Sequence, residues 1–409
     1  MEGSNKKVNP AYPQATAGQE LGTRPIRVAL IAPSPRAIGG QAAQAQFLLR
    51  KWAGDPAVRV RFIASDPQLP HGLSWAEGIP YLRTAFRFPV YLWRLWQGLR
   101  DCDVAHIFSA SYWSFLLVPM PARVLAGWRS CKAVLHYHSG EASDHLQRWP
   151  SAVRSLRKMH AVVVPSEYLQ KLMGQFGISA RVVANGIDAE RFRYRARKPL
   201  RPVLVCTRAL EPYYRVDLVV RAFAWLREIF PEARLSLVGD GRCEGQIRAL
   251  ISELGGNGVE FLGAIENEKI HTAYHNCDIY VNASVVDNMP ISILEAFACG
   301  NVVVSSAAGG IRHLVEHERT GLLSEPGDWQ SLAANILRVL RDPALSDRLA
   351  ENANKVSERY RWSHLRAEWL LVYSSVLGET TATSESGETI GAASSLKVGA
   401  NEVGANGRA

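Results

Sequence analysis

The sequence predicts an α/β protein made of two doubly wound domains in tandem, with a ligand cleft between them. Three observations predict this class: a length of 409 residues, a composition that is 47% hydrophobic and 21% charged, and short β-branched runs that alternate with helical patterns. The length suits two domains of roughly 150–200 residues each. The alternation is typical of parallel sheets covered by helices on both faces.

Each predicted strand is a short apolar run bounded by turn residues. The first half offers five such runs, at 26–32, 58–64, 103–109, 132–138 and 160–165. The second half offers five more, at 201–207, 234–239, 259–263, 278–284 and 301–306. Helical segments of suitable length fill most of the gaps, so we expect two Rossmann-like sheets.

Domain boundaries follow from changes in composition. A polar stretch ending in Pro199 predicts a linker, which places the first domain at 25–198 and the second at 199–361. The segments 1–24 and 378–409 hold too few large apolar residues to offset the entropy of ordering, so we expect disordered tails.

Composition also excludes several classes. None of the six cysteines forms a CxxC pair, which argues against a zinc ribbon and suits a reducing compartment. Residues 1–24 contain no apolar stretch of a secretory signal, and no run of about 18 apolar residues predicts a spanning helix. We therefore expect a cytoplasmic protein.

The segment 278–300, DIYVNASVVDNMPISILEAFACG, carries the most chemistry. It predicts a strand, a loop with Asp287, and a helix that begins at Pro290 and includes Glu295. Two carboxylates would then flank a helix N-terminus, which binds anions through its free N–H groups, here those of Ile291 and Ser292. A nucleotide sugar offers the matching combination of diphosphate and hydroxyls.

This segment resembles the E-x7-E motif of the retaining glycosyltransferases of family 4, which have the GT-B fold. By position, Glu295 matches the second Glu, which in that family holds the donor ribose. Asp287 stands in place of the first, which contacts the transferred sugar. The resemblance also implies donor contacts from the backbone between them, through Met289, Pro290, Ile291 and Ser292.

A second stretch, TRALEPYYRVD at 207–217, resembles the family's R…K segment, whose cations bind the donor diphosphate. Arg208 matches the Arg, whereas the Lys position falls on Tyr213 or Tyr214. We expect Arg215 to supply the second positive charge. In the Gly-rich turn VGDGRCEG, the resemblance implies that Gly241 borders the nucleotide.

In the first domain, Gly39 and Gly40 end a loop, and a helix begins near Gln41. The resemblance implies that this loop reaches the donor phosphate and the acceptor. It also implies a cleft-facing His138 near the transferred sugar, at the end of a strand. Two other interpretations of HYHSGEASDHL at 136–146 stay open: a metal site and a buried structural histidine.

Two helices have predicted packing roles. PVYLWRLWQGLR at 89–100 has Leu92, Leu95, Trp96 and Leu99 on one face. This helix either packs on the sheet as a crossover, which we favour, or rests on a membrane as in some relatives. The helix at 362–377 resembles the family's final helix, which crosses back to the first domain.

The resemblance, covering about 26–377, implies a retaining hexosyltransferase that uses a UDP- or GDP-sugar and needs no metal or other cofactor. His138, Asp287 and Arg208 are the catalytic candidates. The acceptor would be a saccharide or lipid-linked hydroxyl in glycan, glycolipid or cell-surface polysaccharide synthesis. Two alternatives stay open: a non-catalytic nucleotide- or glycan-binding protein, and a nucleotide-sugar epimerase. A Rossmann dehydrogenase is disfavoured because no G-x-G-x-x-G follows the first strand.

The formal net charge of +9 is unevenly divided. Residues 25–198 hold 24 basic and 10 acidic groups, or +14, whereas residues 199–377 hold 18 and 22, or −4. No nucleic-acid-binding motif accompanies the excess, so we expect no nucleic-acid partner. A polyanionic or lipid-linked acceptor at the inner face of an anionic membrane fits this distribution.

Overall fold

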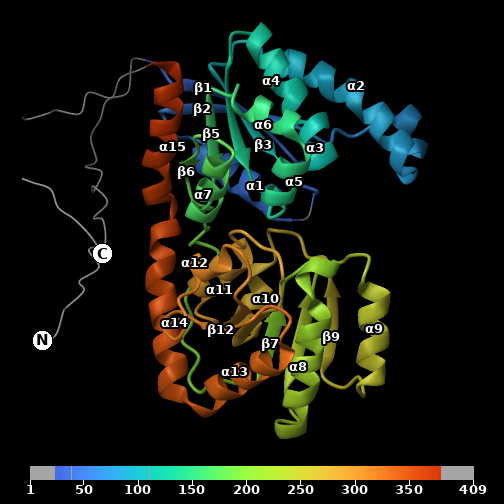
Figure 1. Ribbon diagram of the computed structural model, residues 1–409, viewed down its shortest axis with the longest axis vertical. Coiled ribbons are helices and arrows are strands. Elements are labelled where there is room, and N and C mark those ends of the chain that lie inside the picture. Colours follow the sequence, from blue (N-terminus) through green and yellow to red (C-terminus); the bar gives the residue numbers. More distant parts are fainter. Residues whose placement is uncertain (1–23, 38, 110, 379–409) are drawn as a thin grey trace, which may run out of the picture.

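The computed structural model describes residues 24–37, 39–109 and 111–378. Figure 1 shows two lobes stacked along the long axis, each with a sheet inside and helices around it. Apart from Arg24 and Gly378, the predicted tails lie outside the described residues. No helix in the described ranges is long and apolar enough to cross a membrane.

The first sheet is parallel throughout, with strand order β2-β1-β3-β4-β5-β6. Its strands are β1 (Ile26–Ala32), β2 (Val58–Ala64), β3 (Val104–Ser109), β4 (Lys132–Tyr137), β5 (Ala161–Val164) and β6 (Arg181–Val182). The five predicted strands are confirmed. The prediction missed β6, because two residues at a sheet edge are too few to show a periodic pattern.

Helices connect these strands and cover both faces of the sheet. They are α1 (Gly40–Trp52), α2 (Pro80–Gly98), α3 (Tyr112–Leu117), α4 (Pro119–Trp128), α5 (Ala142–Arg148), α6 (Pro150–Leu156) and α7 (Glu167–Gln175), with a 3₁₀ turn η1 at His71–Gly78. Along β1, Ala29 and Ile31 pack on one face while Val28 and Leu30 pack on the other. Burial on both faces explains the continuous apolar run in the sequence.

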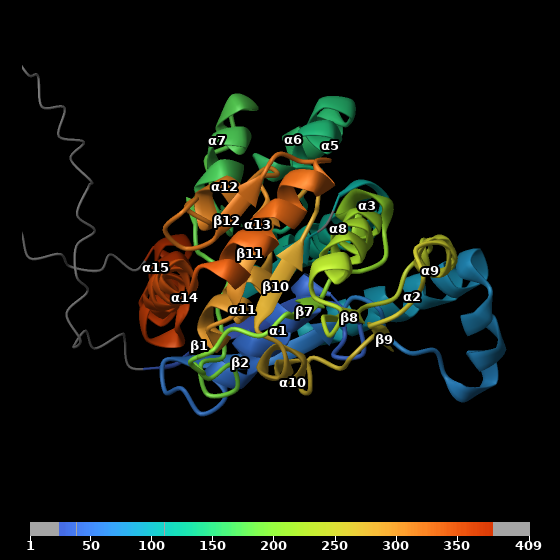
Figure 2. The same ribbon diagram turned by 90° about the horizontal axis from the view of Figure 1, so that it is seen from below.

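The second sheet is also parallel, with strand order β12-β11-β10-β7-β8-β9 (Figure 2). Its strands are β7 (Val203–Cys206), β8 (Arg234–Val238), β9 (Val259–Gly263), β10 (Ile279–Asn282), β11 (Val302–Ser306) and β12 (Leu322–Ser324). The five predictions are confirmed, and only the short edge strand β12 was missed. The strand order reverses between β7 and β10, where doubly wound sheets bind ligands.

The helices of the second half complete the fold. They are α8 (Val216–Ile229), α9 (Glu244–Glu253), α10 (His271–Asn276), α11 (Ile291–Cys299), α12 (Ile311–Leu314), α13 (Trp329–Arg341), α14 (Pro343–Ser357) and α15 (Trp362–Leu377), with 3₁₀ turns η2 (Pro212–Tyr214) and η3 (Glu358–Tyr360). The two parallel sheets with flanking helices confirm the predicted fold class.

Helix α15 lies against the first sheet and, with α14, runs along one side of both lobes (Figure 1). Leu365 and Trp369 are buried in a cluster with Trp52 of α1. The guanidinium of Arg366 donates from Nε to Oδ2 of Asp55 at 2.6 Å. Packing and this ion pair therefore tie the last helix to the first domain.

The predicted helix at 89–100 is longer than expected and packs less completely. Helix α2 spans Pro80–Gly98 with Pro89 inside it. Leu95 and Leu99 are fully buried, as a crossover helix requires. Trp96, predicted on the same packing face, is 40% exposed instead. The spacing places four residues on one stripe of the helix, but the rest of the domain fully buries only Leu95 and Leu99 of the four.

Candidate functional site

A cavity of about 300 Å³ opens where the carboxyl ends of the two sheets face each other. The first domain lines it with Gly40, Gln41 and His138. The second domain lines it from the loops after β7 and β10, with Arg208, Tyr213, Tyr214, Asp287, Met289, Pro290 and Ile291. Since β7 and β10 are neighbours at the switch point of the second sheet, their loops meet here.

Arg208 and Asp287 meet in this cavity. Nη2 of Arg208 donates to Oδ2 of Asp287 at 2.5 Å, and Nη1 donates to the Ser292 hydroxyl at 3.3 Å. The guanidinium also lies 3.8 Å from the centroid of the Tyr214 ring. Burial opposes the positive charge, but the Asp287 carboxylate outweighs it and raises the pKa of Arg208. The cavity therefore holds a permanent cation.

The Asp287 loop is packed tightly against two glycines. A Cβ atom at Gly309 would lie 2.2 Å from the carbonyl oxygen of Asp287, and one at Gly310 would lie 1.9 Å from that of Asn288. Gly310 N–H also donates to the Asp287 carbonyl at 3.1 Å. Burial raises the pKa of the Asp287 carboxyl, against the opposing effect of Arg208. The loop thus holds a carboxyl group whose ionised form is stabilised by Arg208.

Two helix N-termini point at the cavity from opposite domains. Helix α11 begins at Ile291, one residue later than predicted, and Pro290 is its N-cap residue in an extended conformation. Helix α1 begins at Gly40, after Gly39 with φ of +137°. A Cβ at Gly40 would lie 3.3 Å from Cδ1 of Ile291, so glycine permits the close approach. Free N–H groups and aligned dipoles at both ends favour an anion between them.

Glu295 lies one turn inside α11, on the far side of Ile291. It lines a much smaller adjoining cavity of about 20 Å³, and Ile291 lines both cavities. The Tyr274 hydroxyl donates to Oε2 of Glu295 at 2.6 Å and lies 2.7 Å from the Thr207 hydroxyl. Burial raises the pKa of Glu295 to about 7. This carboxylate is therefore held in place and titrates near neutrality.

His138 directly follows β4, whose last residue is Tyr137, one earlier than predicted. Its ring stacks on Phe108, with centroids 5.0 Å apart and planes 6° apart, and lies 4.0 Å from the His136 ring. Burial lowers the pKa of His138 to about 3, so the imidazole is neutral at physiological pH. Its buried Nε2 has no hydrogen-bond partner among the described residues, which leaves it available to a ligand.

Hydrogen bonds from the first half of the chain reach the loop between the two carboxylates. The Ser166 hydroxyl donates to Oδ1 of Asn288 at 2.5 Å. Nδ2 of Asn185 donates to the carbonyl of Met289 at 3.0 Å. Gln44 in turn binds both the N–H and the C=O of Gly186. These bonds fix the α11 N-terminus relative to the first domain.

Three predicted donor-binding residues, Arg215, Gly241 and Ser292, line neither the main cavity nor the smaller cavity beside Glu295. Arg215 makes two hydrogen bonds to Asp217, at 2.9 Å each, and does not line the cavity. Gly241 does not line it either. A Cβ there would lie 2.5 Å from the Leu210 carbonyl, so this glycine lets its loop pack against the strand end that carries Arg208.

No group of three metal-ligating side chains is arranged to hold a metal ion in the part of the chain that the structure describes. Within the 136–146 motif, Nδ1 of His145 pairs with the Tyr137 hydroxyl at 2.8 Å, and Asp144 pairs with Tyr112 and Arg148. These side chains therefore have separate structural partners.

Sequence reasoning gave no role to Tyr274, and it considered Glu141 only as part of a metal site. Tyr274 positions Glu295, and Glu141 lines the main cavity. No local pattern marks Tyr274, which lies on α10 and meets Glu295 only through packing. As a whole, the site combines one guanidinium and two helix N-termini with a carboxylate on either side. It suits a ligand with an anionic centre and hydroxyl groups at both ends.

Comparison with known families gives two matches that together span most of the chain. Residues 188–356 match the family described as glycosyl transferases group 1. Residues 18–191 match the family described as glycosyltransferase family 4. The junction of the two matches lies beside the predicted linker.

Among curated proteins, an uncharacterized glycosyltransferase, MJ1607, of Methanocaldococcus jannaschii is 31% identical over 160 residues. That match covers 39% of this chain and 41% of the relative. A glycogen synthase of Mycobacterium tuberculosis is 29% identical over 293 residues, which cover 66% of this chain and 68% of the relative. The chain thus spans under half of the first relative and about two thirds of the second.

Among solved structures, Anabaena HepE in complex with UDP-glucose aligns with a TM-score of 0.66 at 19% identity. The alignment covers 86% of this chain and 100% of HepE. At this level of identity, the likeness establishes the shared two-domain fold.

Proposed function

We propose that this chain, which belongs to the GT-B glycosyltransferases of family 4 and group 1, moves a hexosyl unit from a nucleoside diphosphate sugar to an acceptor hydroxyl with retention of configuration. One observation carries the proposal. Arg208 and the N-termini of α1 and α11 converge on one cavity, with Asp287 and Glu295 on either side of Ile291.

In the proposed complex, the donor diphosphate lies between the two helix N-termini and accepts hydrogen bonds from Arg208. Tyr213 and Tyr214, one of which stands at the place of the family Lys, both line the same cavity and offer phenolic donors instead of a charge. Ionised Glu295 accepts hydrogen bonds from the ribose hydroxyls. Asp287 accepts hydrogen bonds from the transferred sugar once Arg208 turns to the phosphates.

The proposed reaction is a front-face displacement. The bond from sugar C1 to the leaving phosphate oxygen breaks, while the acceptor oxygen bonds to C1 on the same face. The acceptor proton passes to an oxygen of the leaving diphosphate. Arg208 and the helix N–H groups stabilise the charge that develops on the leaving group, so the reaction needs no metal ion. Neutral His138 positions the sugar by hydrogen bonding.

Donor hydrolysis followed by proton NMR tests this proposal without a known acceptor. The chain is incubated with UDP-glucose, GDP-mannose and related donors, and the anomer that forms first is recorded. Slow release of nucleoside diphosphate with the donor's own anomeric configuration supports retention. Binding without any turnover selects the non-catalytic alternative. Conversion of one donor into another without an acceptor selects the epimerase.

We also propose that the first domain contacts an anionic membrane surface through a groove between α2 and α4. The groove has a volume of about 630 Å³ and an almost wholly apolar lining, formed by Phe88, Leu92, Trp93, Trp96, Leu116, Met120, Pro121, Val124, Leu125 and Trp128. Trp93 is 59% exposed and Trp128 is 72% exposed. The Arg129 guanidinium lies 3.5 Å from the Trp96 ring centroid. Exposed indoles beside arginines suit the interface of an anionic bilayer.

Vesicle sedimentation tests the contact, and with it the expected place at the inner face of the cytoplasmic membrane. Phosphatidylglycerol vesicles should retain the full chain at low salt, and high salt should release it. Trp93→Ser combined with Trp128→Ser should lower retention. Leu254→Ser, at a residue 39% exposed in the second domain, is the matched control. Equal retention by all variants contradicts the contact.

A further inference from the structure

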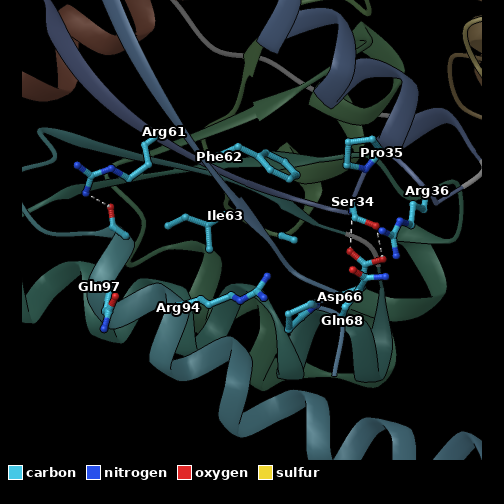
Figure 3. Close-up of a pocket in the computed structure, with 13 residues that line it drawn as sticks. Ser34, Pro35, Arg36, Arg61, Phe62, Ile63, Asp66, Gln68, Arg94 and Gln97 are labelled. Atoms are coloured by element: carbon cyan, nitrogen blue, oxygen red, sulfur yellow. Dashed lines mark hydrogen bonds between the residues drawn. The ribbon is translucent and has the colours of Figure 1, made fainter. Parts of the chain in front are cut away.

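A second cavity, of about 610 Å³, lies in the first domain at the carboxyl end of β2. The loop after β1 forms one wall, and helix α2 forms another (Figure 3). Its polar lining includes Ser34, Arg36, Arg61, Asp66, Arg94 and Gln97. The volume falls in the range of about 300–1,000 Å³ that is usual for small-molecule sites.

Two arginines of this cavity have no direct partner among the residues that the structure describes. Arg36 and Arg94 have neither an ion pair nor a hydrogen bond to a side chain or backbone group in the described ranges. Figure 3 shows Arg94 extending from α2 along the cavity toward Asp66 and Gln68. Arg61 differs, because it turns away and donates Nη1 to the carbonyls of Gly98 and Arg100 at 3.1 and 3.0 Å.

The one carboxylate in the lining is already engaged. Oδ1 of Asp66 accepts from the Ser34 N–H at 2.6 Å, and Oδ2 accepts from the Ser34 hydroxyl at 2.8 Å. These bonds fix the start of the loop after β1 and leave Arg36 and Arg94 unneutralised by direct contact. With three arginines and one aspartate, the lining is net positive.

The loop after β1 connects this cavity to the proposed donor site. Ser34, Pro35 and Arg36 of this loop line the cationic cavity, whereas Gly40 and Gln41, at the start of α1, line the donor cavity. This one loop therefore leads from the cationic cavity to the proposed donor site. Phe62 and Pro35 add apolar surface, on which the C–H face of a sugar ring packs well.

We propose that this cavity, defined by Arg36, Arg94 and Asp66, binds an anionic group of the acceptor, either a carboxylate or a phosphate. This inference rests on the proposed function, because it places an acceptor beside the donor. Two guanidinium groups without direct partners among the described residues supply planar donors that match carboxylate and phosphate oxygens. The excess of positive charge in residues 25–198 would draw such an acceptor to this domain.

Calorimetric titration of the full chain with UDP present tests the cavity. Glucose 6-phosphate and glucuronate serve as anionic probes, and glucose is the uncharged match. Wild type should bind the anionic sugars more tightly than glucose. Arg36→Gln combined with Arg94→Gln should weaken that binding about tenfold, and Arg94→Lys should keep part of it. Arg59→Gln combined with Arg154→Gln removes equal charge outside the cavity lining and should have little effect.

A second arm repeats the two double variants on phosphatidylglycerol and phosphatidylcholine vesicles. Loss of sugar-phosphate binding assigns the anion to a soluble saccharide acceptor. If the cavity variant loses only retention on phosphatidylglycerol vesicles, and the charge-matched control keeps it, the bound anion is a lipid headgroup. If neither arm distinguishes the cavity variant from the control, the inference is wrong. A wild type that binds neither UDP nor GDP overturns the proposed function instead.

Discussion

The guanidinium of Arg208 and the carboxylate of Asp287 form an ion pair across the switch point of the second sheet, with 9% and 12% of their side chains exposed. Each residue follows a different strand, and each was predicted to bind a different part of the donor. In the free protein they satisfy each other. Donor binding would therefore exchange this ion pair for contacts with the diphosphate and the sugar.

Arg208→Ala should remove most turnover and cost about 3–5 kcal/mol of folding free energy, because it leaves a buried carboxylate without its partner. Adding Asp287→Asn should restore much of the stability but not the turnover. Urea unfolding and donor hydrolysis measure the two quantities separately. If the single and double variants were equally stable, the unpaired Asp287 carboxylate would cost little folding free energy.

The pKa of Glu295, about 7, predicts a pH-dependent donor affinity. Only the carboxylate accepts hydrogen bonds from both ribose hydroxyls, so the KM for the donor should rise about tenfold per pH unit below 7. Glu295→Gln should bind donor weakly at every pH and abolish this slope, whereas Glu253→Gln on α9 should keep it. A flat wild-type profile would contradict the assignment.

The same shift affects folding with the opposite sign. Burial raises the pKa of Glu295 above its ordinary value of 4.5, so ionising it costs folding free energy. Wild type should therefore lose some stability relative to Glu295→Gln as the pH rises from about 4.5 toward and beyond 7. Urea midpoints of the two proteins at pH 5 and pH 8 measure this difference.

Gly310→Ala should weaken donor binding from outside the cavity. The added methyl would meet the Asn288 carbonyl at 1.9 Å and push the loop that holds Asp287. We expect a loss of about 1–3 kcal/mol in stability together with a higher donor KM. Gly174→Ala on α7, where a Cβ meets nothing within 4 Å, should be neutral or stabilising by up to about 1 kcal/mol.

His138 should act as a neutral group throughout the usual assay range, because burial lowers its pKa to about 3. His138→Asn should therefore lower kcat by a similar factor at every pH from 6 to 9. Initial rates at saturating donor measure this effect. A wild-type step in kcat near pH 6.5 that disappears in the variant would contradict a neutral role.

The fold was predictable because local and global signals agree along most of the chain. Burial on both faces leaves runs such as 28–32 and 302–304 apolar throughout, which single-sequence reasoning detects. Strands β6 and β12 escaped because edge strands of two and three residues leave no pattern. The exposure of Trp96 was not predicted, because residue spacing identifies the apolar stripe of a helix but not how much of that stripe its neighbours cover.

The site was predictable where residues near in sequence act together, as along 287–295. The site was less predictable where packing brings together residues that are distant in the sequence. Tyr274 reaches Glu295 from another helix, and Arg36 and Arg94, far apart in the sequence, line the same cavity. Arg215 was predicted from its sequence position to bind the donor. In the structure its guanidinium instead pairs with the nearby Asp217.

Thermal unfolding of the wild type, Arg208→Ala and Glu295→Ala across a panel of nucleoside diphosphate sugars tests the donor site most directly. A ligand that binds only the folded state raises the melting temperature. The account predicts a rise for wild type with at least one UDP- or GDP-sugar, and its loss in both variants. No rise with any of these donors, or an equal rise in all three proteins, would contradict it.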